Sequence, residues 1–170
     1  MLPPTKFEDL HSIANEVKSS LENLGLKCVF AESCTGGMVA AAMATVPGVS
    51  GFLCGSAVTY RESAKSLWLG VDAELLAQHS AESMETTVAM AESVLERTSE
   101  ADIAVAVTGH LGPGAAAEKD GVIFLALAQK HRPTLSKRIQ LSQQDRCQRQ
   151  VEAAGETLNF LLAEIRVPQI

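Results

Sequence analysis

The sequence is poor in aromatic residues, which make up 4% of its 170 residues and include one Trp and one Tyr. Its apolar share of 46% therefore consists mainly of aliphatic residues, which suit helices packed against a sheet. An apolar share of this size argues against a disordered chain. Because 170 residues is an ordinary size for one domain, we expect a single domain over residues 1–170.

The chain also lacks an excess of basic residues and any long hydrophobic run. It has 14 Lys and Arg against 20 Asp and Glu, which gives a net charge of −6. This balance argues against nucleic acid or an anionic membrane as a partner, although a local basic pocket for one phosphate stays open. No apolar run approaches the roughly 20 residues that cross a bilayer, and the N-terminus does not look like a secretory signal. We therefore expect a cytoplasmic protein.

Cysteine is sparse, and its spacing carries no metal or disulfide pattern. The four cysteines form no C-x-x-C pair and have no histidine at metal-ligand spacing; they are Cys28, Cys34, Cys54 and Cys147. In a chain without a secretory signal we expect reduced thiols, no disulfide and no metal site. The four histidines are scattered along the chain, which favours surface positions over ligands.

Hydrophobic periodicity predicts an α/β fold in which helices and strands alternate. The apolar run Ile103–Val107 is typical of a strand buried on both faces, whereas the segment 135–141 alternates with polar residues and follows Pro133, which favours an edge strand. We expect a layered α/β/α domain with a mixed, mostly buried sheet and ligand loops at the strand ends. The predicted strands cover about residues 26–31, 52–59, 103–107, 122–128 and 135–141, and the predicted helices about 7–24, 38–46, 72–79, 83–97 and 143–165.

Helix starts are predicted from the residues that precede each helical pattern. Thr5 and Glu8 have the spacing of a capping box before the first helix. Asp72 and Ser83 stand where a side-chain oxygen can accept a hydrogen bond from the first turn of the two middle helices.

The stretch Ala31–Gly37 (AESCTGG) reads as a turn from a strand into a helix. Gly36 and Gly37 let backbone N–H groups approach a ligand closely, and the first turn of the next helix leaves such donors unpaired. The turn can therefore hold an anion or a developing oxyanion, with Ser33 as a nucleophile beside it. The alternative is that Ser33 or Thr35 caps the helix and the glycines only permit the turn.

Three further segments, each short and polar, follow in a fixed order. Their sequences are PGVS (residues 47–50), VTY followed by AK (58–60 and 64–65), and AVTG followed by GPG (106–109 and 112–114). Together with AESCTGG, they resemble the C-terminal domain family of the competence/damage-inducible protein CinA. The resemblance covers about residues 29–128, and a weaker match lies at Asp145-Arg146.

The resemblance implies an enzyme activity, because stand-alone members of the family include nicotinamide-nucleotide amidases. The implied reaction converts nicotinamide mononucleotide and water to nicotinate mononucleotide and ammonia, without a metal or an organic cofactor. It implies a small-molecule nucleotide as the partner and is compatible with a homo-oligomer, a dimer or higher, as the assembly. A CinA protein can carry a larger N-terminal domain, which we do not expect in this chain.

The resemblance assigns the catalytic roles to three residues. Ser33 matches the family's motif serine and is the predicted nucleophile. Lys65 is the predicted base, since no histidine occurs in the matched segments and a desolvated lysine can accept a proton. Tyr60 is predicted to bind Ser33 or the leaving amide. The alternatives are a solvated surface lysine, a half-buried strand-end tyrosine, and Cys34 as the nucleophile instead of a buried structural thiol.

The predicted substrate-binding residues lie on the turn, on the glycine loop and at two outlying positions. The loop is expected to offer hydroxyl and backbone donors to a phosphate or ribose, Ser50 a relay hydroxyl, and Arg146 a charge for the phosphate. The full set is Cys34, Thr35, Gly36, Gly37, Ser50, Thr108, Gly109, Gly112, Gly114 and Arg146.

The chain departs from the family pattern in its binding segments. Arg61-Glu62-Ser63 stands where a Ser-Asn pair is usual, His110-Leu111 replaces a small apolar pair, and Ala115–Ala117 replaces glycines; Ser56-Ala57 replaces a Gly and aromatic pair. An alternative function is therefore a catalytically impaired nucleotide-binding or regulatory module of the same fold. A P-loop phosphotransferase is excluded, because no Gly-Lys-Ser/Thr follows a glycine loop.

Overall fold

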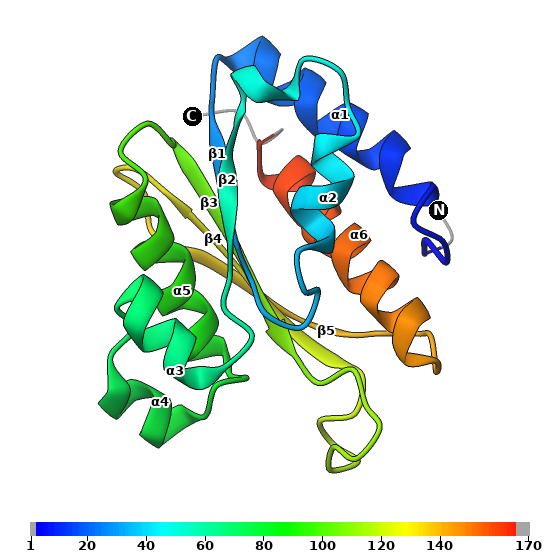
Figure 1. The fold of residues 1–170 in the computed structure, drawn as a ribbon, viewed down its shortest axis with the longest axis vertical. Coiled ribbons are helices and arrows are strands. Elements are labelled where there is room, and N and C mark those ends of the chain that lie inside the picture. Colours follow the sequence, from blue (N-terminus) through cyan, green and yellow to red (C-terminus); the bar gives the residue numbers. More distant parts are fainter. Residues whose placement is uncertain (1–2, 166–170) are drawn as a thin grey trace.

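A computed structural model describes residues 3–165 and places a central sheet between two helical layers (Figure 1). The strand order is β2-β1-β3-β4-β5. The three strands β2, β1 and β3 run parallel, and β4 and β5 continue the sheet antiparallel, which confirms the predicted mixed sheet. The strands are β1 (Cys28–Glu32), β2 (Leu53–Val58), β3 (Ile103–Gly109), β4 (Val122–Gln129) and β5 (Leu135–Gln140).

The helices divide between the two faces of the sheet (Figure 1). One face carries α1 (Asp9–Leu24), α2 (Met38–Ala44) and α6 (Arg146–Ile165), and the other carries α3 (Glu62–Ala64), α4 (Ala73–His79) and α5 (Met84–Arg97). This arrangement is the predicted α/β/α layering. Two short turns complete the order, η1 (Val49–Gly51) and the one-turn π-helix η2 (Lys65–Leu69).

Alternate residues of the central strands enter different cores, as the two-residue period of a strand requires. Large side chains such as Phe30, Val105 and Leu125 face the core under α1, α2 and α6. The other face presents mainly alanines, including Ala104 and Ala126, to the core under α5. Small side chains on that face let α5 pack directly against the sheet.

Two of the three predicted helix starts are confirmed. The Asp72 side chain accepts a hydrogen bond from the Glu74 amide, and the Ser83 hydroxyl accepts one from the Thr86 amide. The capping box of Thr5 and Glu8 is wrong, because Glu8 makes no side-chain cap bond. The Asp9 carboxylate instead accepts the backbone N–H groups of Thr5 and Lys6, each at 3.0 Å.

The topology creates a crevice at the carboxyl edge of the parallel strands. The chain passes from β1 to β2 on one side and then to β3 on the other side of β1, so the loops after β1 and β3 diverge. Ligands of such sheets bind at this switch point. Because β4 is antiparallel to β3, residues 110–121 lie at the same edge, where they project beyond the sheet (Figure 1).

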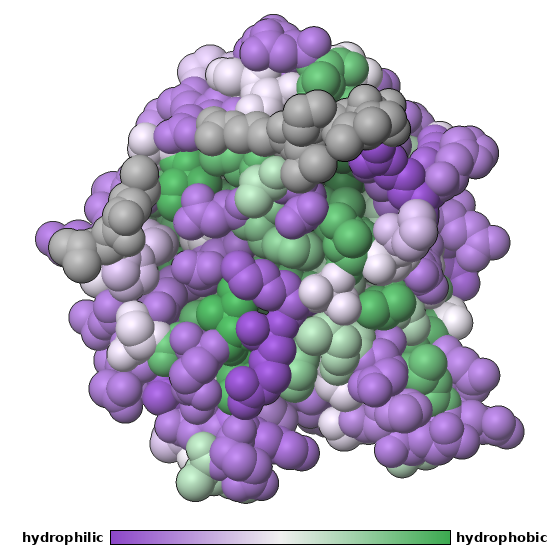
Figure 2. Space-filling view, turned by 180° about the vertical axis from the view of Figure 1, so that it is seen from behind, coloured by the Kyte–Doolittle hydropathy of each residue, from purple (hydrophilic) through white to green (hydrophobic). Residues whose placement is uncertain are grey.

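Strand β5 is the predicted edge strand, and five of its six residues are exposed. The face seen from behind is largely hydrophilic, with apolar residues gathered in separate patches (Figure 2). Within residues 3–165, no helix has the length and apolar character needed to cross a membrane.

Candidate active site

Ser33 and Lys65 meet at the carboxyl edge of the sheet, although 32 positions separate them in the sequence. Ser33 follows β1 directly and is 4% exposed, while Lys65 is fully buried. The Lys65 Nζ lies 3.0 Å from the Ser33 Oγ and 2.9 Å from the Thr59 carbonyl oxygen, to which it donates. We call Ser33 and Lys65 the candidate catalytic pair.

The π-helix η2 brings Lys65 to this position, and sequence periodicity did not predict it. Lys65 is its first residue, directly after the short helix α3. Single π-helical turns are rare in proteins, and those that occur are often found at functional sites. Burial lowers the pKa of Lys65 below its usual 10.5, because removal from water disfavours the ammonium form; the nearby charge of Glu82 opposes this effect. Lys65 is therefore easier to deprotonate than a surface lysine.

The N-terminus of α2 is occupied by an internal carboxylate. Glu32 is fully buried and accepts five hydrogen bonds of 2.7 to 3.1 Å. The donors are the hydroxyls of Thr35 and Ser56 and the amides of Gly37, Val39 and Ala40. The prediction that these helix N–H groups hold a substrate oxyanion is therefore wrong, because the Glu32 carboxylate already accepts from them. The alternative that Ser33 or Thr35 caps the helix is also wrong, because Glu32 is the capping side chain.

A cavity of about 480 Å³ opens in front of Ser33, a size that suits a small ligand. Its lining comes from the Ser33 turn, the end of β2, the start of α5, the start of α6 and the segment after β3. The lining residues are Ser33, Cys34, Tyr60, Glu82, Gly109, His110, Leu111, Gly112, Pro113, Gly114, Ala115, Ala116, Lys119 and Arg146.

Cys34 lines the cavity, but its environment favours the neutral thiol. The residue is 6% exposed. Burial raises the pKa of its thiol to about 12, because a thiolate is costly away from water. The structure therefore favours the interpretation of Cys34 as a buried thiol beside Ser33.

Tyr60 and Arg146 form one edge of the cavity. Arg146 donates a hydrogen bond of 3.0 Å to the Tyr60 hydroxyl and another to the Gly112 carbonyl oxygen. Tyr60 is 58% exposed. Among residues 3–165 it makes no hydrogen bond to Ser33, so the structure pairs its hydroxyl with Arg146 instead.

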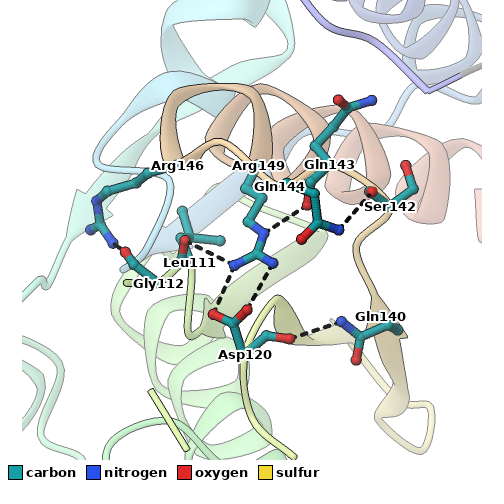
Figure 3. Close-up of polar contacts among 9 residues, drawn as sticks. All are labelled: Leu111, Gly112, Asp120, Gln140, Ser142, Gln143, Gln144, Arg146 and Arg149. Carbon is teal, nitrogen blue, oxygen red and sulfur yellow. Dashed lines mark hydrogen bonds and ion pairs between the residues drawn. The ribbon is translucent and has the colours of Figure 1, made fainter. Parts of the chain in front are cut away.

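Arg149 holds the segment 109–121, which we call the binding loop, against α6 (Figure 3). Its guanidinium donates to both Asp120 carboxylate oxygens at 2.8 and 2.9 Å, and to the carbonyl oxygens of Leu111 and Gln143. The side chain is buried, and the bonds to Arg149 hold the pKa of Asp120 below its usual value. One arginine thus joins both ends of the loop to the helix.

Glycine is required at position 112 of the binding loop. Gly112 has a φ of +66°, and a Cβ there would lie 2.7 Å from Asp120 and 2.9 Å from Arg149. A side chain would therefore both strain the backbone and push against the Arg149–Asp120 pair. The peptide bond from Gly112 to Pro113 is cis.

The structure brings seven of the thirteen predicted site residues to the cavity lining. Lys65 does not line the cavity but contacts Ser33, which does. The seven are Ser33, Cys34, Tyr60, Gly109, Gly112, Gly114 and Arg146.

The remaining five predicted residues lie elsewhere. Thr35 and Gly37 bind Glu32, and Gly36 faces Gln150. Thr108 is fully buried and shares a 2.7 Å hydrogen bond with Thr87, and it is not among the residues that line the cavity. Ser50 is exposed in η1, which precedes β2 and therefore lies at the opposite edge of the sheet.

Three charged or ionisable cavity residues were not predicted. Glu82 precedes the cap of α5, His110 follows β3, and Lys119 lies in the binding loop. None belongs to a motif, and each resembles an ordinary loop residue in the sequence. In the described part of the chain, no group of three or more His, Cys, Asp or Glu could hold a metal ion.

The chain is similar to curated proteins named as CinA-like or as competence-damage inducible. A CinA-like protein of Myxococcus xanthus is 39% identical over 155 residues, which are 90% of this chain and 36% of that protein. A putative competence-damage inducible protein of Desulforamulus reducens is 41% identical over 122 residues, 71% of this chain and 29% of that protein. The chain thus spans about a third of the length of these curated relatives.

Solved structures agree with the sequence comparison. The competence/damage inducible protein CihA of Agrobacterium tumefaciens superposes with a TM-score of 0.86 at 34% identity, over 96% of this chain and 98% of that one. The competence damage-inducible protein ComA of Klebsiella pneumoniae gives 0.88 at 31% identity, over 94% and 99%. The profile of the CinA C-terminal domain matches residues 10–165. The chain therefore belongs to the CinA C-terminal domain family.

Proposed function

We propose that this protein is an amidohydrolase that converts nicotinamide mononucleotide and water to nicotinate mononucleotide and ammonia. The observation that carries the proposal is the contact between the buried Lys65 amine and the Ser33 hydroxyl at 3.0 Å, beside a cavity large enough for a nucleotide. A serine with a lysine base is an established arrangement for acyl transfer.

In the first half of the reaction, the neutral Lys65 amine takes the Ser33 proton while Oγ bonds to the carboxamide carbon. Lys65 then returns this proton to the departing nitrogen, the carbon–nitrogen bond breaks, and ammonia leaves an ester on Ser33. The Thr59 carbonyl supports this step, because it accepts one N–H of Lys65 and so directs the amine lone pair.

In the second half, water attacks the ester and Lys65 accepts the water proton. The proton passes to Oγ as the carbon–oxygen bond to Ser33 breaks. The free enzyme is regenerated, and the carboxylic acid is released as its anion. The sum of both halves is hydrolysis of one amide bond with no cofactor consumed.

Cationic groups of the cavity fit the phosphate of a mononucleotide. The basic side chains Lys119 and Arg146 both line it. Arg146 is further fixed by its bonds to Gly112 and Tyr60, which presents its guanidinium as a preorganised fork for an oxyanion. Phosphate binding at these groups would hold the ring amide against Ser33.

The runner-up function is a nucleotide-binding module without turnover. One observation favours it: Glu32 occupies the α2 amides that would otherwise stabilise a substrate oxyanion. Such a module would bind nicotinamide mononucleotide and release no ammonia.

Ammonia release from nicotinamide mononucleotide tests the proposal directly. We expect turnover by the unmodified protein and a loss of at least about a hundredfold in Ser33→Ala, the scale on which removal of a nucleophile is felt. Cys34→Ala is the matched control on the adjacent residue and should keep most of the activity. The opposite pattern would assign the attack to Cys34, and no turnover with intact binding would favour the module.

A further inference from the structure

Glu82 is the cavity carboxylate that the proposed chemistry leaves without a role. It lines the same cavity as Ser33, at the start of α5, and its side chain is 32% exposed. Within residues 3–165 its carboxylate accepts no hydrogen bond, and the basic side chain within 4.0 Å of it is His110, whose Nε2 lies at 3.9 Å. This distance is too long for a hydrogen bond.

Glu82 also lies close enough to the candidate catalytic pair for its charge to act there. Among nearby charges, it has the largest effect in raising the pKa of Lys65 against the lowering caused by burial. Lys65 in turn touches the Ser33 Oγ. A carboxylate that acts on Lys65 must also act on the charge of the product carboxylate, whose oxygens are attached to the carbon that Ser33 attacks.

The proposed reaction changes the charge at that point of the ligand. The substrate carries a neutral carboxamide, whose NH₂ group can donate hydrogen bonds, and the product carries a carboxylate, which can only accept them. The ring, ribose and phosphate are the same in both molecules. A fixed negative charge beside this group therefore favours the substrate and repels the product.

We propose that Glu82 is a specificity-determining residue that makes the cavity prefer a carboxamide nucleotide over the matching carboxylate nucleotide. This inference rests on the proposed function for the orientation of the ligand. Its consequence is that hydrolysis weakens the binding of its own product, so product leaves the cavity and inhibits the enzyme only weakly.

The test measures binding apart from turnover, in a Ser33→Ala background that keeps the substrate intact. Calorimetry gives dissociation constants for nicotinamide mononucleotide and for nicotinate mononucleotide. We expect the Ser33→Ala protein to bind the amide more tightly. Adding Glu82→Gln should tighten the acid about tenfold and change the amide less than about threefold, as expected for loss of one nearby charge in a partly solvated site.

Glu85→Gln is the matched control, because it removes the same charge from the first turn of α5. The Glu85 carboxylate is 52% exposed and faces His79 rather than the cavity, so neither dissociation constant should change. Glu82→Asp keeps the charge on a shorter side chain and should retain part of the preference. An unchanged amide-to-acid ratio in Glu82→Gln would overturn the inference, and so would a failure of both nucleotides to bind.

Failure of the proposed function gives a different result. If the unmodified protein releases no ammonia but Glu82→Gln still changes the amide-to-acid ratio, the hydrolase assignment fails and the role of Glu82 stands. If ammonia is released and the ratio does not move, the hydrolase stands and the role of Glu82 fails.

Discussion

Glu32 and Glu82 are two carboxylates close to the same serine, and the fold treats them in opposite ways. Glu32 is fully buried and accepts five hydrogen bonds from its own chain. Glu82 lines the cavity and accepts none within residues 3–165. A carboxylate whose acceptors are filled by the chain builds structure, whereas one whose acceptors face a cavity is available to a ligand.

The comparison extends to the rest of the site. The candidate catalytic pair and Glu32 are fixed by bonds within the fold, so changes there should act on turnover or on stability. The binding loop and Glu82 contact the cavity, so changes there should act on affinity. Three substitutions, in order of decreasing effect, can break this division.

Lys65→Arg should have the largest effect. Arginine keeps the positive charge but does not lose its proton in the working range, so it cannot act as a base. We expect kcat to fall by about two to four powers of ten, the usual worth of general base catalysis. Near-normal turnover in a correctly folded Lys65→Arg protein would show that the lysine acts by its charge alone.

The pH profile of the unmodified enzyme sharpens the same test. If Lys65 is the base, its neutral amine is the active form, and activity should rise with pH along a limb set by Lys65. Because burial lowers the pKa of Lys65, this limb should lie below the usual value of 10.5. A rate that falls as the pH rises through that range would contradict the base assignment.

Glu32→Gln should have the next largest effect, on stability. The amide nitrogen of Gln is a donor, so at least one buried N–H or O–H that now binds Glu32 would lose its acceptor. We expect the free energy of unfolding, measured in denaturant, to fall by about 2–4 kcal/mol.

The control for Glu32→Gln is the same change at an exposed glutamate. Glu22 is 53% exposed and pairs with Lys18 on the surface of α1. Glu22→Gln should cost less than about 1 kcal/mol, as is usual for surface ion pairs. Equal losses for the two variants would mean that the hydrogen bonds of Glu32 carry no special weight.

Asp120→Asn should have the smallest effect of the three and should act mainly on affinity. Without the carboxylate, Arg149 loses the acceptor that binds two of its nitrogens. The binding loop then loses this anchor on α6. We expect KM for the nucleotide to rise roughly tenfold, about 1.4 kcal/mol, with a smaller change in kcat. A fall in kcat at constant KM would place the loop in the chemical step.

Stability measurements against pH test the same ion pair. The pKa of Asp120 is held below its usual 3.8 by Arg149, so the pair stabilises the protein above that pH. The difference in unfolding free energy between the unmodified protein and Asp120→Asn should therefore be present near neutral pH. It should shrink as the pH falls below about 4 through the lowered pKa. If the difference in unfolding free energy did not change with pH, the Asp120–Arg149 ion pair could not be its source.

Much of the fold could be predicted because it follows local periodicity. The buried strand at Ile103, the exposed edge strand after Pro133 and the caps Asp72 and Ser83 all depend on residues close together in the sequence. The predicted capping box at the first helix was wrong, because several neighbouring polar residues could have filled the same role. The turn before α1 offers several polar side chains, and Asp9 rather than Glu8 reaches the free amides.

The sequence pattern was sufficient for the family and the layered α/β/α fold, because these depend on short ordered segments. It also singled out Ser33 and Lys65, whose side chains the structure brings into contact. It could not show that Glu32 fills the N-terminus of α2, that Arg149 anchors the binding loop, or that Glu82 faces the cavity. Each of these depends on which donors and acceptors the folded chain brings within about 3 Å. The sequence does not distinguish a glutamate that supports the fold from one that faces a ligand. For Glu32 the folded turn after β1 decides, because it aims four donors from the next eight residues, and the Ser56 hydroxyl of β2, at one carboxylate.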